Sequence, residues 1–234
     1  MYIDVAYCLQ TNVVKYYRNK NMSNRFVQGY FYHIFNKSIS NFQIFGRNEN
    51  KQRFLNVLDY YDKEKINLSF SAFLKDNEKF KANILSPKNN SFVKFISYSI
   101  MPDHYHLLVK ILDDNKVSKY ISDVENSYSR FFNLKLERKG PLWQSRFKAV
   151  KIETEEQLLH VSRYIHLNPT TASLVEKPED WEFSSYRQII TDPFILKEYL
   201  KEIPISNNFT YKRFVERNKD YQRKLKLIKK LILE

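Results

Sequence analysis

The stretch from Ser99 to Val109, SIMPDHYHLLV, decides the fold of this chain. Pro102 and Asp103 are typical turn residues, and an apolar run stands on each side of them, so two strands joined by a tight turn are expected. His104 and His106 are two of the chain's five histidines and open the second strand. Because side chains alternate along a strand, both imidazoles should project from one face, roughly 7 Å apart at about 3.3–3.4 Å per residue.

This histidine pair has two interpretations. Two imidazoles held by a rigid strand suit a divalent metal ion if an oxygen ligand joins them. The ordinary alternative is that one histidine lies at the surface and the other is simply hydrogen-bonded within the fold. The rest of the chain has to decide between the two.

Six further segments surround the hairpin formed by strands 92–100 and 104–112. Turn residues and hydrophobic periodicity predict a strand at 28–36, a helix at 49–63, a helical insertion at 66–91, a helix at 116–136, a strand at 142–152 and a helix that begins at Thr154 and stops at Asn168-Pro169. Without the insertion this is a β-α-β-β-α-β order, which predicts an α+β, ferredoxin-like fold. An antiparallel sheet with helices on one face should result, and the open face should carry the chemistry.

The chain divides into three expected parts. Residues 1–24 are polar and lack a clear period, which indicates an N-terminal extension. Residues 25–190 form the main domain, and residues 191–234 form a basic helical C-terminal extension with helices at 193–202 and 211–233. The many lysines and arginines of the last helix fit a solvated face or, less simply, a helix that contacts DNA.

The composition indicates a globular protein with a polyanionic partner. Of 234 residues, 43% are hydrophobic, and 39 Lys and Arg against 26 Asp and Glu give a formal charge of +13. Binding to nucleic acid is the simplest physical reason for this excess, and a Lys-rich composition from an AT-rich genome is the alternative. The single cysteine, Cys8, excludes an intramolecular disulfide. With no long apolar run or signal sequence, a cytoplasmic protein without membrane association is expected.

Tyr164 and Asn168 lie four residues apart on the helix that begins at Thr154, so they share one helix face. A tyrosine nucleophile beside an amide oxygen ligand would complete a metal site. The ordinary alternative is a packing tyrosine followed by a common helix-stop pair, Asn-Pro. His166 falls on another face of the helix and is expected to be structural.

Four segments resemble one family in the same order. The segment MPDHYHLL at 101–108 resembles the histidine-hydrophobic-histidine motif of the single-tyrosine HUH transposases of the IS200-like superfamily, particularly the REP-associated tyrosine transposases. GYFYHIFN at 29–36, GPLWQSRFK at 140–148 and RYIHLNP at 163–169 are also similar to that family. The resemblance covers roughly residues 25 to 190, with one departure, because Asp103 stands where the family usually has Asn.

The resemblance implies an activity and a set of site residues. It matches His104, His106 and Asn168 to the metal ligands, for Mg²⁺ or Mn²⁺, and Tyr164 to the nucleophile. The implied enzyme is a metal-dependent transposase or endonuclease that cleaves and rejoins single-stranded DNA through a 5′-phosphotyrosine. The implied partner is single-stranded DNA with hairpin or palindromic ends. Tyr164 could act beside its own chain's ion or, in a homodimer, beside the ion of the second copy.

Strand 142–152 alternates basic and apolar residues, which predicts a cationic face that contacts phosphates. The candidates for these phosphate contacts are Arg146, Lys148 and Lys151. Trp143 and Tyr105 are candidates for stacking on bases, although packing in the core is the simpler expectation for both.

Two rival functions stay open at this stage. The same scaffold could belong to a non-catalytic or domesticated protein that binds single-stranded nucleic acid. It could also belong to a metal-dependent phosphodiesterase in which water replaces the tyrosine.

Overall fold

A four-stranded antiparallel sheet forms the centre of the molecule, with strand order β2-β3-β1-β4. The computed structural model describes residues 26–64, 66–86, 88–220 and 222. The strands are β1 (Phe31–Lys37), β2 (Val93–Ile100), β3 (His104–Ile111) and β4 (Lys148–Ile152). The tight β2–β3 connection at 101–103 is the hairpin predicted from the sequence.

The sheet has one apolar face and one face that carries histidines. On β3, Tyr105 and Leu107 alternate with His106 and Leu108, and all four are buried. The ring of Tyr105 packs against Phe54, with the ring centres 4.9 Å apart. His106 points to the opposite face because successive side chains along a strand alternate between the two faces of the sheet.

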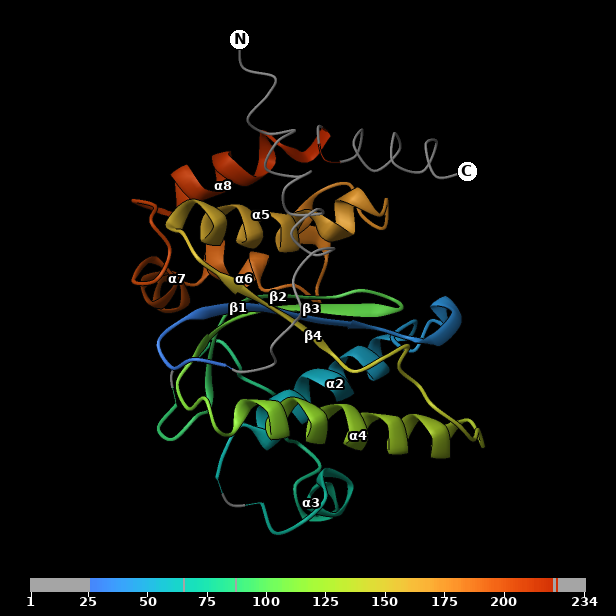
Figure 1. Ribbon diagram of the computed structural model, residues 1–234. Helices are drawn as coiled ribbons and strands as arrows, with labels where there is room; N and C mark the ends of the chain where they lie inside the picture. The colour runs from blue at the N-terminus through green and yellow to red at the C-terminus, as the bar shows by residue number, and fades with distance from the viewer. Residues whose placement is uncertain (1–25, 65, 87, 221, 223–234) are drawn as a thin grey trace.

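Two helices cover the Tyr105 face, as Figure 1 shows. They are α2 (Asn48–Tyr61) and α4 (Val117–Lys135), and the short α3 (Phe70–Asp76) lies in the predicted insertion. The rings of Phe54 on α2 and Tyr128 on α4 meet with centres 5.3 Å apart. The ferredoxin-like β-α-β-β-α-β core predicted from the sequence is therefore confirmed.

The histidine face is covered as well, so the expected open face is wrong. Helix α5 (Glu155–Thr171) crosses this face and contacts β2, β3 and β4. Three shorter helices lie on the same side (Figure 1): α6 (Tyr186–Thr191), α7 (Pro193–Leu200) and α8 (Asn208–Glu216). Two single-turn 3₁₀ helices, Ile39–Asn41 and Pro178–Asp180, complete the elements described. The apolar stripe of α5 requires this burial, and any chemistry on the histidine face must take place between sheet and helix.

Helix α5 begins as predicted and ends later than predicted. The Thr154 side chain accepts a hydrogen bond from the backbone N–H of Gln157 at 3.1 Å, which is the expected cap. The predicted stop at Asn168-Pro169 is wrong, because the helix continues through Pro169 to Thr171. Proline in the last turn removes one backbone donor, and the N–H of Ala172 still donates to the carbonyl of Asn168 at 2.9 Å.

The predicted strand 142–152 is regular only in its second half. Trp143 forms an isolated bridge with Ser38, and the segment then bends before β4 begins at Lys148. The Asn36 side chain donates to the carbonyl of Ser145 at 3.0 Å and fixes this bend. Helix α8 begins at Asn208, three residues before the predicted start. The expected extension at 1–24 and residues 223–234 lie outside the described residues.

A buried polar network anchors α5 to the helices behind it. His166 is fully buried, its Nδ1 lies 2.6 Å from the hydroxyl of Tyr211 on α8, and its Nε2 lies 2.8 Å from the Ser185 hydroxyl. Ser162, one turn earlier, contacts the hydroxyls of Tyr199 at 2.7 Å and Tyr211 at 2.9 Å. The structural role predicted for His166 is confirmed, and the network fixes the helix that carries Tyr164.

Glu125 is a buried carboxyl on the other side of the sheet. Its Oε1 accepts hydrogen bonds from the Asn36 amide at 2.7 Å and the Tyr105 hydroxyl at 2.8 Å. Burial raises the pKa of Glu125 from 4.5 to about 7, although both hydrogen bonds act to lower it. The folded protein therefore holds a proton on Glu125 over a pH range in which the unfolded chain has released it.

This raised pKa predicts that the protein loses stability as the pH rises from about 4.5 to 7. Between these pH values Glu125 is protonated in the folded protein and ionised in the unfolded chain, so folding must take up a proton. The stabilisation from protonated Glu125 is therefore complete below pH 4.5, the pKa in the unfolded chain, and is lost as the pH rises to about 7, the pKa in the folded protein. The free energy of unfolding should fall by on the order of 3 kcal/mol more in the wild type than in Glu125→Gln. Urea titrations at pH 4.5, 6 and 7.5 measure this, with the exposed Glu155→Gln as control. Parallel pH profiles for wild type and Glu125→Gln would contradict it.

Candidate active site between the sheet and α5

His104 and His106 start β3 at the end of the sheet where the β2–β3 hairpin turns. His106 is opposite Phe35 on β1 and Ser99 on β2, which places it in the middle of the sheet. The two imidazole centres lie 5.0 Å apart, with the rings nearly perpendicular. With metal–nitrogen bonds of about 2 Å, two rings at this separation can both reach one ion.

Asp103 fixes the orientation of the first histidine. Its Oδ1 lies 2.5 Å from His104 Nδ1, and its Oδ2 lies 3.3 Å from the Nζ of Lys37. Burial acts to raise the pKa of Asp103, but the hydrogen bonds and charges of His104 and Lys37 outweigh it, so the pKa lies below its usual value. With Nδ1 engaged by a carboxylate, His104 has Nε2 available for an external ligand.

A third histidine, His33 on β1, holds the second one. Its Nε2 lies 2.9 Å from His106 Nδ1, and the rings stack with centres 5.1 Å apart. Burial lowers the pKa of His33 to about 3. The pKa of His106 is also far below its usual value because of burial and the nearby charges of His104 and His33. Both imidazoles are therefore neutral at physiological pH, the form in which histidine binds metals.

Tyr164 on α5 lies against these histidines. Its ring packs edge-on to His106, with centres 5.6 Å apart, and to His33, with centres 6.2 Å apart. It is 37% exposed, so solvent and substrate can reach it. Burial of part of the side chain raises the pKa of Tyr164, and the neighbouring Asn168 side chain acts in the opposite direction. The two elements predicted to form one site, β3 and α5, therefore meet.

Asn168 lies one turn beyond Tyr164 and is buried. Its side chain lies close enough to the Tyr164 hydroxyl for a hydrogen bond between them to act on the pKa of Tyr164, although its Nδ2 has no well-formed hydrogen bond among the described residues. A buried amide group without a well-formed hydrogen bond costs about 1–3 kcal/mol, and this one lies beside Tyr164. A half-turn of the amide exchanges Nδ2 for Oδ1 and presents an oxygen in its place.

These donors fit a divalent ion held by two imidazoles and one amide oxygen. His104 and His106 have their Nδ1 atoms engaged, and the Asn168 amide would supply the third position. In the described part of the chain, no three His, Cys, Asp or Glu side chains are placed to share an ion. An ion bound by the two imidazoles would take its further ligands from the Asn168 amide, from water or from substrate oxygens.

The predicted phosphate-contacting residues do not lie on one face. Lys148 is exposed and is opposite Phe35, the neighbour of His106, so it is on the histidine face. Lys151 has the other parity, and its Nζ lies 3.5 Å from the ring centre of Tyr30. Arg146 is exposed and precedes β4. The structure thus brings Lys148 to the histidine face and places Lys151 on the other face.

The two aromatic residues considered for base stacking belong to the core side. Tyr105 is 1% exposed and donates to Glu125. Trp143 is partly buried, its Nε1 donates to the carbonyl of Glu125 at 3.3 Å, and its ring centre lies 5.7 Å from that of Tyr105. The simpler expectation for both residues is the one that the structure supports.

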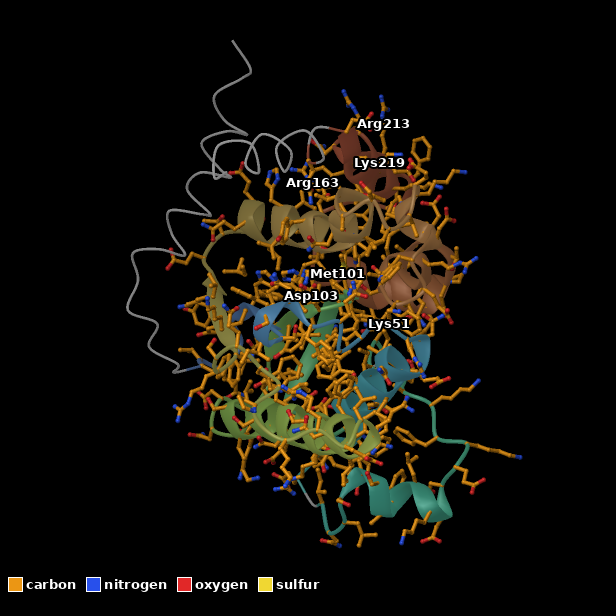
Figure 2. The ribbon with its side chains drawn as sticks, turned by 90° about the vertical axis from the view of Figure 1, so that its right-hand side faces the viewer. Lys51, Met101, Asp103, Arg163, Arg213 and Lys219 are labelled. Carbon is orange, nitrogen blue, oxygen red and sulfur yellow. The ribbon has the colours of Figure 1, made fainter. Side chains whose placement is uncertain are left out.

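Arg163 shows how sharply α5 separates its two sides. It directly precedes Tyr164, yet its guanidinium lies 4.4 Å from the ring centre of Phe214 on the α8 side. In Figure 2, Arg163 lies above α5, whereas Met101 and Asp103 lie below it at the level of the sheet. Tyr164 alone of this pair faces the histidines.

Sequence reasoning missed His33. The residue stands in the strand predicted at 28–36 and in a segment used for the family resemblance, but no role was expected for it. Its position two residues before Phe35 shows only that the two side chains share one face of the strand. Its contact with His106 depends on the register between β1 and β3, which pairs His33 with Leu108 and not directly with His106.

Comparisons with known proteins confirm the resemblance predicted from the sequence. The family model described as "Transposase IS200 like" matches residues 71–168. This range includes His104, His106, Tyr164 and Asn168, and it leaves out β1 with His33. Among curated proteins, the chain is similar to a putative REP-associated tyrosine transposase from Haemophilus influenzae, at 27% identity over 103 residues. That alignment covers 40% of this chain and 58% of the relative, so it spans less than two thirds of the relative's length.

Two solved structures are also similar to this chain. One is the structure of a REP-associated tyrosine transposase bound to a REP hairpin, with 15% identity, a TM-score of 0.49 and coverage of 72% of this chain and 84% of that chain. The other is a putative transposase from Deinococcus radiodurans, with 12% identity, a TM-score of 0.34 and coverage of 60% and 91%.

Within the described residues, no helix is long and apolar enough to cross a membrane.

The contact between Asp103 and His104 predicts a weaker metal site in Asp103→Asn. An amide is a weaker acceptor for the His104 Nδ1–H than a carboxylate, so the affinity for Mn²⁺ should fall by about 10-fold. Titration of Mn²⁺ followed by electron paramagnetic resonance measures this. Lys37→Gln, which removes the other partner of Asp103, is the matched control and should change the affinity much less. An equal loss in both variants would assign the effect to general charge.

Proposed function

We propose, from the premise that this chain is a relative of the IS200-like and REP-associated tyrosine transposases, that it cleaves and rejoins single-stranded DNA with Tyr164 as nucleophile. The single observation that carries the proposal is the position of Tyr164. Its ring lies 5.6 Å from that of His106, on a helix whose other side is anchored by buried polar contacts. A nucleophile held beside donors for a phosphate-binding ion is the arrangement that phosphoryl transfer needs.

The residues of this chain divide the work of the reaction. His104, His106 and Asn168 would hold Mg²⁺ or Mn²⁺, which supplies positive charge to the phosphate oxygens when bound. The Tyr164 hydroxyl loses its proton to water at its exposed edge, and its oxygen attacks phosphorus. The bond to the 3′-oxygen breaks, and that oxygen takes a proton and leaves as a 3′-hydroxyl. The product is a 5′-phosphotyrosine.

Rejoining is the reverse of the same steps. A 3′-hydroxyl attacks the phosphotyrosine, and Tyr164 leaves with its proton restored. No nucleotide cofactor is needed, because the phosphotyrosine bond retains the energy of the original phosphodiester.

The charge of the chain supports a nucleic acid as the substrate. The formal charge is +13, and exposed Lys148 stands on the histidine face of the sheet near the site. Its ammonium would contact the backbone and position the strand, while base-paired hairpin ends would supply specificity. Arg146, at the exposed approach to β4, would add a second backbone contact.

The nucleophile and the metal donors lie together within one chain. Because Tyr164 contacts His106 of the same chain, the site does not need a second copy for its assembly. We therefore propose that Tyr164 acts beside its own chain's ion, even if the protein forms a homodimer.

Replacing the nucleophile gives the central test. With Mn²⁺ and labelled single-stranded DNA that contains a hairpin, the wild type should form a covalent adduct that survives denaturing electrophoresis. Tyr164→Phe should form at least about 1,000-fold less, because phenylalanine lacks the attacking oxygen. Tyr30→Phe, another exposed tyrosine, is the matched control. An equal amount of adduct with Tyr164→Phe would contradict the assignment, and DNA cleavage that survives without adduct would point to water as the nucleophile.

Mixing two inactive variants tests the arrangement within one chain. Tyr164→Phe and His106→Ala each lack one half of the site, so a mixture should stay inactive if each chain uses its own tyrosine. Recovery of adduct in the mixture, measured on the same DNA, would show that the tyrosine acts at the site of a second copy.

A further inference from the structure

We propose that His33 is a positioning residue that fixes the tautomer of His106, so that His106 presents an unprotonated Nε2 to the ion. The comparisons assign no role to His33, which lies outside the matched residues 71–168. The proposal rests on the proposed function, because it assigns a purpose to His106 that needs the ion.

The geometry of the two rings is the first observation. His33 Nε2 lies 2.9 Å from His106 Nδ1, which is the length of a full hydrogen bond. Both side chains are buried, with 2% exposure for His33 and 7% for His106. Water is therefore a poor substitute for either partner in this contact, and the hydrogen that joins the two rings belongs to one of these two nitrogens.

Only one hydrogen fits between two nitrogens at this distance. In the first arrangement, His106 donates its Nδ1–H to His33 Nε2, and its own Nε2 keeps a lone pair. In the second, His33 donates, and His106 carries its hydrogen on Nε2. A metal ion can bind only the first form, so a partner that accepts from Nδ1 prepares the ligand before the ion arrives.

His104 provides an internal parallel for this interpretation. Its Nδ1 is engaged by the carboxylate of Asp103 at the half-exposed edge of the site, where Lys37 balances the charge. The contact of His106 lies deeper in the sheet, and there the acceptor is a neutral imidazole. A carboxylate at the His33 position would carry a buried charge at a high desolvation cost, so a neutral acceptor achieves the same positioning more cheaply.

Packing holds His33 in position for this role. Its ring lies between Phe35, with centres 4.9 Å apart, and Tyr164, with centres 6.2 Å apart. The same imidazole therefore contacts one proposed metal ligand and the proposed nucleophile. This places His33 at the point where β1, β3 and α5 meet.

Two substitutions of His33 separate the acceptor from the bulk of the ring. His33→Leu removes the acceptor, and His33→Gln supplies an amide oxygen that can accept from His106 Nδ1. Mn²⁺ affinity, measured by electron paramagnetic resonance without DNA, should fall by about 10- to 100-fold in His33→Leu and recover most of that loss in His33→Gln. Tyr120→Leu is the matched control, since it also removes a buried ring with a hydrogen bond, to the carbonyl of Leu58 at 2.8 Å, but on α4 across the sheet from the site, and it should lower stability without lowering Mn²⁺ affinity.

A second measurement needs neither Mn²⁺ nor a variant that folds well. Nitrogen-15 NMR of metal-free wild type with labelled histidine reports which ring nitrogen of His106 carries the hydrogen. Hydrogen on Nδ1 is expected, and hydrogen on Nε2 would overturn the role of His33.

The two measurements distinguish this proposal from the proposed function. If the wild type binds Mn²⁺ and His33→Leu binds it equally well, the role of His33 is wrong and the metal site stands. If the wild type binds no Mn²⁺ while His106 carries its hydrogen on Nδ1, the metal site is wrong and the tautomer assignment stands.

Discussion

The packing of α5 across the histidine face of the sheet is the constraint on which the rest of the site depends. A ferredoxin-like core already has two helices on its other face, so a strongly apolar sheet such as this one still has a second face to cover. Helix α5 covers it and at the same time brings Tyr164 against His106, with ring centres 5.6 Å apart. The burial that stabilises the sheet and the contact that forms the site are therefore one interface.

This interface is unusual because part of it is polar. Imidazoles buried between a sheet and a helix lose their hydration, and the protein offsets that cost with hydrogen bonds on both sides of α5. On the sheet side, His33 and His106 share a hydrogen bond. On the far side, His166 contacts Tyr211 and Ser185. The helix is thus fixed by directional contacts at its back, while Tyr164 at its front stays 37% exposed.

Much of this architecture is readable in the sequence, and the limits have physical causes. Alternation in 104–111 and the turn at Pro102-Asp103 define the hairpin, and helical periodicity defines α2, α4 and the start of α5. These signals are local, so they predict elements and the faces of single strands. The end of α5 was misplaced because burial of the last turn outweighs one donor lost at Pro169. The covering of the histidine face was not predicted, because the apolar pattern of α5 shows that the helix is buried but does not show which surface it is buried against.

The difference between local and long-range signals also explains why the sequence predicts roles for His104 and His106 but not for His33. Two residues apart on one strand, His104 and His106 are neighbours whatever the fold. His33 is 73 residues from His106 in sequence, and it reaches His106 diagonally because β1 pairs Phe35 with that residue. A shift of one residue in this pairing would turn His33 into the α2–α4 layer. The ligands can thus be proposed from spacing, whereas the residue that orients one of them is defined by strand register, which no local pattern in β1 reveals.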